Sequence, residues 1–384
     1  MLPGSLTSVS ALTGSVEPIY GAEAYRSIDS TVKDKNPYGE LSVNDLKWRA
    51  PYSSNVETQT FYFTTEDNYY GFVQVIHSNP IGLHFTAQFT CLVVNDDKDI
   101  KVWTSTNLEN FVAKDTEFNA DGMSISLNEE ANQYVISSVV SEDTLVELTF
   151  TRDTLGFKIG DDGTSLYGED LTNPWGSMRH VFWPRVSASG KLVVKGQDVV
   201  LSNARAMFVM AMQGMKPHHA AKSWNFLNFQ GPTMSTVVME YITPPSYGEQ
   251  RSSIGAFVKD NKLISTGVEV KIEHIDPEVD EVGWPAPQSI KFELDGPKIE
   301  ASSDKISDKE ERVLVTVEGD LKRLVDRVDV MAEIPSFIKS IAAGVSGAKP
   351  YIYQYYNKMK LTAVIDGKTI EEEGIAFSEA TFIS

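Results

Sequence analysis

The stretch LHFTAQFTCLV, residues 83–93, alternates apolar and polar side chains, and this pattern restricts the fold more than any other feature of the chain. Its alternating apolar positions are Leu83, Phe85, Ala87, Phe89, Cys91 and Val93. Successive side chains of a strand point to opposite faces of a sheet, whereas a helix would require a spacing of about 3.6 residues. The period of two therefore predicts a strand with one face on an apolar core.

Similar segments recur along the whole chain. Those rich in β-branched and aromatic residues are VETQTFYFTT, YYGFVQVIH, QYVISSVV, TLVELTFT, GKLVVKG and ARAMFVMAM in the first half, and SWNFLNFQG, TVVMEYI, SIGAFVKDN, VEVKIEHI, SIKFELDG, RVLVTVEG, YYNKMKLTAVIDG and GIAFSEATFI in the second. Such composition favours strands. Turn sequences such as NDDKD, ADG and GDDG separate them at short intervals. This spacing predicts an antiparallel all-β fold rather than strands alternating with helices.

A length of 384 residues is too great for one ordinary core and predicts two domains. Both halves begin with an aromatic strand, a turn and another apolar strand, in TFYFTTEDNYYGFVQVIHSNP and in WNFLNFQGPTMSTVVMEYITPP. We therefore expect two consecutive antiparallel β-barrels over residues 51–215 and 216–384, each able to hold one small ligand. An apolar stripe in EIPSFIKSIAAGVSG predicts one late helix, either packed outside a barrel or serving as a lid.

The opening residues, MLPGSLTSVSALTGSV, place apolar side chains on one stripe of a helix, which includes Leu2, Leu6, Val9 and Leu12. The segment has no basic start and no long apolar run, so it matches neither a secretion signal nor a membrane span. Two interpretations remain open, a disordered tail and an amphipathic helix that forms at a lipid surface. We assign residues 1–18 to this amphipathic membrane-binding segment and residues 19–50 to a connecting segment.

The charge balance restricts the partners. Lysine and arginine total 34 against 53 aspartate and glutamate residues, a net charge of −19. This balance disfavours nucleic acid and electrostatic docking on anionic lipid, because both select clustered positive charge. Membrane binding would then depend on apolar insertion into bilayers with packing defects. Cys91 is the only cysteine, which precludes an intrachain disulfide and favours a reducing intracellular compartment.

Few residues suggest catalysis. His218 and His219 are adjacent, so regular strand geometry would point them to opposite faces, and we predict no metal and no cofactor. Phosphate-loop, nucleophile-elbow and paired-cysteine zinc patterns are absent from the sequence. In GSMRHVFWPR, alternation places Arg179, Val181 and Trp183 on one face and His180 and Phe182 on the other. A buried arginine or histidine there either orients the polar head of a ligand or belongs to a structural network.

Several long motifs resemble the fungal survival factor 1 family: MLPGSLTSVSALTGSVEPIYG, VETQTFYF, VIHSNPIGLHFTAQFT, GSMRHVFWPR and GMKPHHAAKSWNFLNFQG. The resemblance covers the chain from Met1 to the last strand. It implies an all-β fold of two consecutive lipocalin-like domains, with an N-terminal amphipathic helix and few additional helices.

The resemblance also implies a function. It suggests a carrier, not an enzyme, that moves ceramide or a similar two-chain lipid from endoplasmic reticulum to Golgi and supports survival of oxidative stress. Its expected location is the cytoplasm, peripheral on both membranes, with the nucleus as a second location. The Met-Leu start favours N-terminal acetylation at Met1. We expect ligand binding by Phe85, Phe89, Arg179, His180 and Trp183, and membrane binding by Leu2, Leu6, Val9 and Leu12.

Two alternatives stay open. Related lipocalin-like hydratases, isomerases and pericyclic enzymes need an acid or base deep in the cavity, for which His84, His180 and Glu240 are candidates. A ligand-free stress-response scaffold would instead have a cavity filled with side chains.

Overall fold

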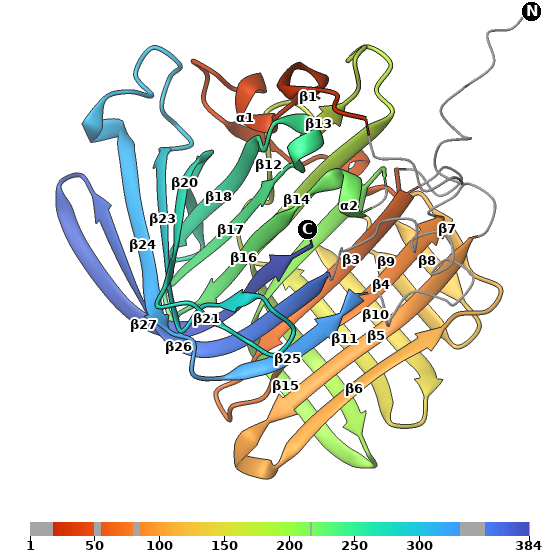
Figure 1. Cartoon of the computed structure of the whole chain (residues 1–384). Coiled ribbons are helices and arrows are strands. Elements are labelled where there is room, and N and C mark those ends of the chain that lie inside the picture. The colour runs from red at the N-terminus through yellow and green to blue at the C-terminus, as the bar shows by residue number, and fades with distance from the viewer. Residues whose placement is uncertain (1–17, 50–54, 80–84, 216, 331–349, 384) are drawn as a thin grey trace, which may run out of the picture.

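The computed structural model describes residues 18–49, 55–79, 85–215, 217–330 and 350–383, and strands form most of this part. They build one 15-stranded and one 10-stranded antiparallel sheet, which lie side by side in Figure 1. The described helices are short: α1 (Ile28–Thr31), α2 (Pro217–Ala220) and the 3-10 turns η3 (Ala22–Ala24), η4 (Val43–Leu46), η5 (Asp96–Lys98), η6 (Pro245–Tyr247) and η7 (Lys309–Glu311).

The first sheet follows the order β6-β5-β4-β3-β15-β14-β11-β10-β9-β8-β7. Its strands are β3 (Asn55–Thr64), β4 (Tyr70–Asn79), β5 (Thr86–Asn95), β6 (Ile100–Asn107), β7 (Val112–Lys114), β8 (Glu117–Ala120), β9 (Met123–Leu127), β10 (Gln133–Ser141), β11 (Thr144–Arg152), β14 (Gly176–Val194) and β15 (Gln197–Gln213). The sheet curls on itself and brings β6 close to β11. The hydroxyls of Thr104 on β6 and Thr144 on β11 form a hydrogen bond of 2.8 Å.

The second sheet repeats this plan in the order β19-β18-β17-β16-β27-β26-β24-β23-β20. Its strands are β16 (Ser223–Gln230), β17 (Met234–Ile242), β18 (Arg251–Lys259), β19 (Lys262–Gly267), β20 (Glu269–Ile275), β23 (Ser289–Pro297), β24 (Arg312–Asp320), β25 (Leu324–Asp329), β26 (Tyr351–Ile365) and β27 (Lys368–Phe382), with a separate pair β21 (Glu278–Val279) and β22 (Pro285–Ala286). In each sheet the first strand of a meander pairs with the last long strand, β3 with β15 and β16 with β27.

The segment expected to connect, residues 19–50, holds the two sheets together. Its β1 (Tyr25–Arg26) and β2 (Tyr38–Glu40) extend the first sheet by pairing with β13 (Thr164–Tyr167) and β12 (Phe157–Ile159). The Asn36 amide donates hydrogen bonds of 2.9 Å to the carbonyls of Lys298 and Ala301, beside the second sheet. The described part of this segment therefore restrains both halves.

Alternation along the strands creates three adjoining cores. On β3, Phe61 and Phe63 face the interior of the first sheet, whereas Tyr62 faces the second sheet. On β16, Leu227 faces the interior of the second sheet and Phe226 faces the first. The core between the sheets is aromatic, and the Tyr62 ring lies 5.6 Å from that of Phe226.

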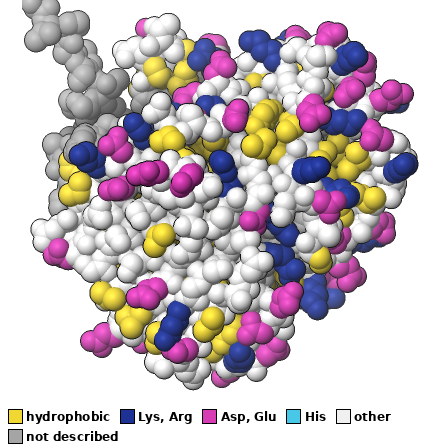
Figure 2. Space-filling view, turned by 180° about the vertical axis from the view of Figure 1, so that it is seen from behind, with side chains coloured by type: hydrophobic (Ala, Val, Ile, Leu, Met, Phe, Trp, Pro, Cys, Tyr) yellow, Lys and Arg dark blue, Asp and Glu magenta, His cyan; other side chains and the backbone are white. Residues whose placement is uncertain are grey.

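The surface agrees with the composition. On the face seen in Figure 2, acidic and basic side chains are interspersed rather than gathered by sign. Exposed ion pairs such as Lys191 with Asp198, at 2.8 Å, contribute little to stability because water screens them.

The all-β prediction with two lipocalin-like domains and few helices is confirmed. The N-terminal helix and the late helix over residues 333–347 fall outside the described residues. The change of sheet falls between Gln213 and Ser223, near the boundary expected at residue 215.

We predict that both sheets unfold in one transition, because they share a core. Leu92 on β5 is fully buried against the second sheet. Leu92→Ala should lower the free energy of unfolding by about 2–5 kcal/mol while keeping a single transition in calorimetry. Leu314→Ala, at a side chain that is 41% exposed, is the control and should change little. Separate transitions for the two halves would contradict this account.

Candidate ligand-binding site between the two sheets

A cavity of about 230 Å³ lies between the two sheets. Its wall comes from β3, β4, β14 and β15 of the first sheet and from β16, β17 and β27 of the second. It adjoins the apolar core between the sheets, to which Tyr62, Phe182, Val209 and Phe226 belong. The cavity thus uses the outward faces of both barrels rather than either interior.

Most of the wall is apolar. Besides the aromatic rings of Tyr62, Phe182, Trp224 and Phe226, three methionines line it, Met178, Met212 and Met239. Methionine is unbranched and adapts to irregular shapes, so such a wall can reshape around an apolar chain. Alternation on β15 places Val209 and Ala211 in this wall, while Met210 between them packs inside the first sheet.

A single carboxylate borders the cavity among the residues that line it. Glu379 on β27 is half-buried, and it accepts a hydrogen bond of 2.8 Å from the amide of Gln354 on β26. Burial raises the pKa of Glu379 to about 7, and the hydrogen bond from Gln354 offsets only part of this effect. Near neutral pH the group therefore exchanges between a carboxylate, which only accepts, and a carboxylic acid, which also donates.

His180 on β14 supplies a second polar group to the cavity. It is 6% exposed, and its ring stacks on that of Phe182 with centroids 6.1 Å apart. Burial, and to a lesser degree the neighbouring charge of Arg179, lowers the pKa of His180 to about 4. The imidazole is thus neutral at pH 7. Nearby, Gln74 donates to the Thr60 hydroxyl at 2.6 Å, so amide and hydroxyl groups also line the wall.

Of the five predicted ligand-binding residues, the structure places His180 in this cavity. Phe89 and Trp183 lie in the core inside the first sheet, where the Trp183 ring is 5.0 Å from that of Tyr134. Phe85 is half-buried beside His77, with ring centroids 6.0 Å apart. A ligand contact for these residues remains a prediction.

Arg179 occupies a polar network with Asp45 of η4 and Asp162 of the turn between β12 and β13. Its guanidinium lies 3.2 Å from the Asp45 carboxylate and donates at 3.0 Å to the Asp162 carbonyl. Lys158 also reaches Asp45, at 2.8 Å. Adjacent residues on β14 point to opposite faces, as expected. His180 therefore lines the cavity, whereas Arg179 points into the polar network. The interpretation of Arg179 as part of a structural network is supported by these contacts.

Of the three residues considered for catalysis, His180 lines the cavity and Glu240 does not. Glu240 is buried and forms an ion pair of 2.9 Å with Arg251, and it is not part of the cavity wall. His84 lies outside the described residues. So do Met1, Leu2, Leu6, Val9 and Leu12.

Within the described ranges, no group of three His, Cys, Asp or Glu side chains is arranged to hold a metal ion. Helices of the described chain are all too short or too polar to cross a bilayer.

The sequence analysis did not predict Glu379 as a site residue, although the sequence around it contains an indication of such a role. In GIAFSEATFI it is a charged residue in the middle of an apolar strand. Ala376 and Ala380 of this strand pack inside the second sheet, whereas Phe377 joins the core between the sheets. Glu379 is two residues from Phe377 and shares its outward face. A single charge in such a strand is costly to bury and therefore marks a candidate site.

The fold and the cavity define a double lipocalin-like protein with a largely apolar cavity between its sheets. Residues 4–384 match the model of the Svf1 family, so the chain belongs to that family. This confirms the resemblance found in the sequence motifs.

Relatives match over nearly the full length. The chain is 49% identical to "Ceramide-binding protein SVF1" of Yarrowia lipolytica over 391 residues, covering 98% of both chains. It is 48% identical to the protein of the same name from Debaryomyces hansenii, covering 100% of both. These relatives are named as ceramide-binding proteins, not as enzymes.

Solved structures support the fold. The structure of CghA with Sch210972 superposes with a TM-score of 0.61 at 12% identity and covers 94% of this chain and 98% of that chain. Kievitone hydratase from Nectria haematococca gives a TM-score of 0.55 at 12% identity, over 95% and 98% of the two chains. At such low identity the likeness concerns architecture alone.

We predict that Glu379 makes stability depend on pH. Its pKa rises from 4.5 to about 7 on folding, so between these values only the folded chain holds the proton. The free energy of unfolding should therefore fall as pH rises through this window, by about 1.4 kcal/mol per pH unit from this group. Glu379→Gln should remove the contribution and be more stable than wild type above pH 7, as measured by urea unfolding across pH.

Glu373→Gln is the control, because Glu373 is exposed on the same strand. Glu373→Gln keeps Glu379 and should therefore retain the fall in the free energy of unfolding that Glu379 causes across the window. A constant difference from wild type for Glu379→Gln would show that Glu379 titrates normally.

Proposed function

We propose that this protein binds ceramide in the cavity between its two sheets and carries it from endoplasmic reticulum to Golgi membranes. The observation that carries the proposal is the largely apolar cavity with a half-buried titratable carboxyl at its wall. The names of the full-length relatives support ceramide as the ligand. Oxidative stress survival, implied by the family resemblance, would follow from maintaining this lipid supply.

The chemistry of ceramide suits the wall. Its head carries hydroxyl groups and an amide, which need acceptors and donors once they leave water. Glu379 with Gln354 offers an acceptor, and a donor when protonated, while neutral His180 offers both a donor and an acceptor. The methionine and aromatic side chains would cover the two apolar chains. Such a site has many apolar contacts and few convergent polar groups.

The size of the cavity suggests how loading proceeds. At about 230 Å³ it is smaller than the roughly 300–1,000 Å³ of typical ligand sites, and a two-chain lipid is larger still. Binding would therefore require the methionine side chains to rotate and the wall to widen. Part of each chain would extend along the mouth. A site that closes when empty suits a carrier, because it limits exposed apolar surface in water.

We also propose that the N-terminal segment attaches the protein reversibly to membranes with packing defects. The argument rests on its apolar stripe and on the absence of lysine and arginine from it. An acetyl group at Met1 would remove the terminal positive charge. The expected location is the cytoplasm, peripheral on endoplasmic reticulum and Golgi membranes, with the nucleus as a second location.

A second candidate function is isomerisation or hydration of an apolar substrate. The observation in its favour is that one cavity holds a histidine with a lowered pKa and a glutamate with a raised one. Pairs of groups with separated pKa values often serve as acid and base. Turnover of a lipid or polyketide by the purified protein, abolished in His180→Ala, would favour the enzyme over the carrier.

We predict that filling the cavity abolishes ceramide binding. Ala211 lines the cavity, so Ala211→Phe should weaken binding of a fluorescent short-chain ceramide by about tenfold or more. It should also remove the lipid that co-purifies with the wild type, as identified by mass spectrometry. Leu314→Phe, at an exposed position, should bind as wild type does. Equal binding by Ala211→Phe, folded by near-ultraviolet circular dichroism, would place the ligand elsewhere.

We predict that membrane attachment depends on the apolar stripe. Leu6→Asp introduces a charge into the stripe and should prevent flotation with small unsaturated liposomes, whereas Ser8→Asp introduces the same charge on the polar face and should still float. Flotation should respond only weakly to salt, because the stripe contains no basic residue. Failure of the wild type to float, or equal flotation of Leu6→Asp, would show that the segment is not a membrane anchor.

A further inference from the structure

A second cleft, of about 460 Å³, opens at another part of the junction between the sheets. It lies between the turn after β3, the strand β15 and the turn after β16, and two arginines line it, Arg185 and Arg205. None of its lining residues lines the cavity proposed for ceramide. The two sites can therefore be tested separately.

Arg185 is buried without a carboxylate at ion-pair distance within the described residues. Its guanidinium donates to the carbonyls of Gly231 at 2.7 Å and Pro232 at 2.8 Å, and to the side-chain oxygen of Gln230 at 3.2 Å. All three acceptors are neutral, so they satisfy hydrogen bonds without cancelling the charge. Burial and the nearby charge of Arg205 lower the pKa of Arg185.

The two carboxylates whose charge affects the pKa of Arg185 accept hydrogen bonds from other groups. Asp153 accepts a hydrogen bond of 2.5 Å from Ser187, and Glu372 accepts from the backbone of Thr233 and Met234. Both raise the pKa of Arg185 by their charge, but less than burial and Arg205 lower it. Within the described residues, the charge of Arg185 therefore has no carboxylate at ion-pair distance.

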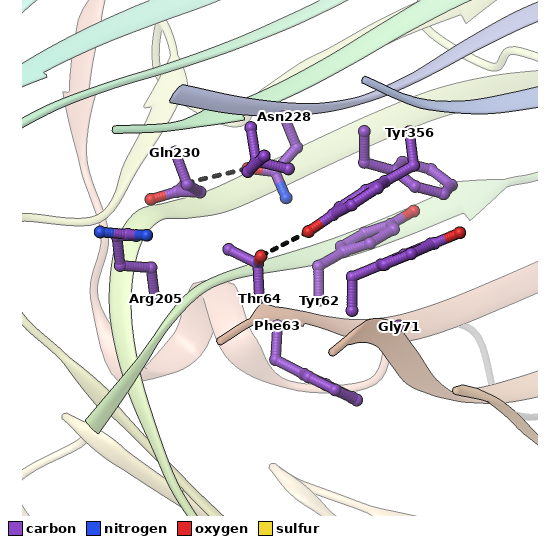
Figure 3. A pocket seen from close by; sticks show the side chains of 11 residues that line it. Tyr62, Phe63, Thr64, Gly71, Arg205, Asn228, Gln230 and Tyr356 are labelled. Carbon is purple, nitrogen blue, oxygen red and sulfur yellow. Dashed lines mark hydrogen bonds between the residues drawn. The ribbon is translucent and has the colours of Figure 1, made fainter. Parts of the chain in front are cut away.

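The side chain of Arg205 has no hydrogen-bond or ion-pair partner in the part of the chain that the structure describes, and its Nε atom is buried. Figure 3 shows its guanidinium beside Gln230, with Thr64 and Asn228 close by. These neighbours already form hydrogen bonds with one another or with Tyr356. Thr64 shares a hydrogen bond of 2.6 Å with Tyr356, and Gln230 donates to Asn228 at 2.9 Å. Arg205, which lines the cleft, is left with unused donors.

Here a guanidinium with unused donors lies near a second guanidinium. An oxyanion could accept hydrogen bonds from the unused donors. The planar guanidinium of Arg205 presents parallel N–H donors that match two oxygens of a phosphate, and the anion would relieve the repulsion between the charges of Arg205 and Arg185. Buried donors without a partner in a native structure commonly mark a bound water or ion. We propose that Arg205 and Arg185 form a binding site for a phosphate group, either free or as the monoester head of a lipid.

The surroundings limit the ligand. Glu66 and Asp67 line the same cleft. Asp67 accepts from Thr65 at 2.6 Å and pairs with Lys98 at 3.3 Å, whereas Glu66 is exposed. Carboxylates on one side would repel a polyanion. The site therefore favours one compact phosphate seated against the arginines, and it disfavours nucleic acid and polyphosphates.

The test compares wild type with Arg205→Gln, and with Arg26→Gln as control. Arg26 is exposed on β1, so this variant changes the net charge equally without touching the cleft. Thermal unfolding is followed against inorganic phosphate, with chloride replaced so that ionic strength stays constant. A saturable rise in the unfolding temperature is expected for wild type and Arg26→Gln and should be absent in Arg205→Gln. Without phosphate, Arg205→Gln should unfold at an equal or higher temperature than wild type.

A second arm distinguishes the source of the phosphate. Flotation is measured with phosphatidylcholine vesicles that contain or lack phosphatidic acid. Added recruitment by phosphatidic acid that needs Arg205, without a response to inorganic phosphate, would assign the site to a lipid head. A response to inorganic phosphate alone would assign it to a soluble phosphate. If neither response depends on Arg205, the proposal is wrong, whatever the outcome for ceramide.

Discussion

The structure depends on strands that are buried on both faces. Each long strand near the junction carries two apolar sets, one directed into its own barrel and one toward the other sheet. On β5, Phe89, Cys91 and Val93 fill the interior of the first sheet, while Leu92 and Val94 meet the second. Burial of apolar surface is the dominant favourable contribution to folding, so this double use joins two barrels into one body. Neither sheet can complete its hydrophobic burial alone.

This constraint also decides where a ligand can bind. Aromatic side chains fill the interior of the first sheet, where the Phe61 ring lies 4.7 Å from that of Phe208. The cavity instead lies where the outward faces of the two sheets do not interlock fully. Polar side chains there, such as Glu379 and His180, lose water on folding, and their pKa values shift toward the neutral form. In the proposed function, a lipid head would give these groups further hydrogen-bond partners.

The sequence predicted the fold because alternation is a local property. The pattern in residues 83–93 identified a strand, and the alternation in GSMRHVFWPR correctly separated Val181 and Trp183 from Phe182. It did not predict the cavity, because pairing of the outward faces depends on contacts between distant strands. Leu92 and Tyr62 interrupt otherwise polar faces, and such exceptions were a local sign of a second buried surface. The ligand residues were sought inside one barrel, and of these the cavity wall contains His180 but none of Phe89, Trp183 and Arg179.

The central claim is that ceramide lies between the sheets and not inside a barrel. Photocrosslinking with a ceramide that carries a photoreactive acyl chain, followed by peptide mass spectrometry, tests it most directly. The account predicts labelling of cavity-wall residues from both sheets, Met212 on β15 and Met239 on β17 among them. Labelling confined to residues of one barrel interior, such as Phe89 and Trp183, would contradict it.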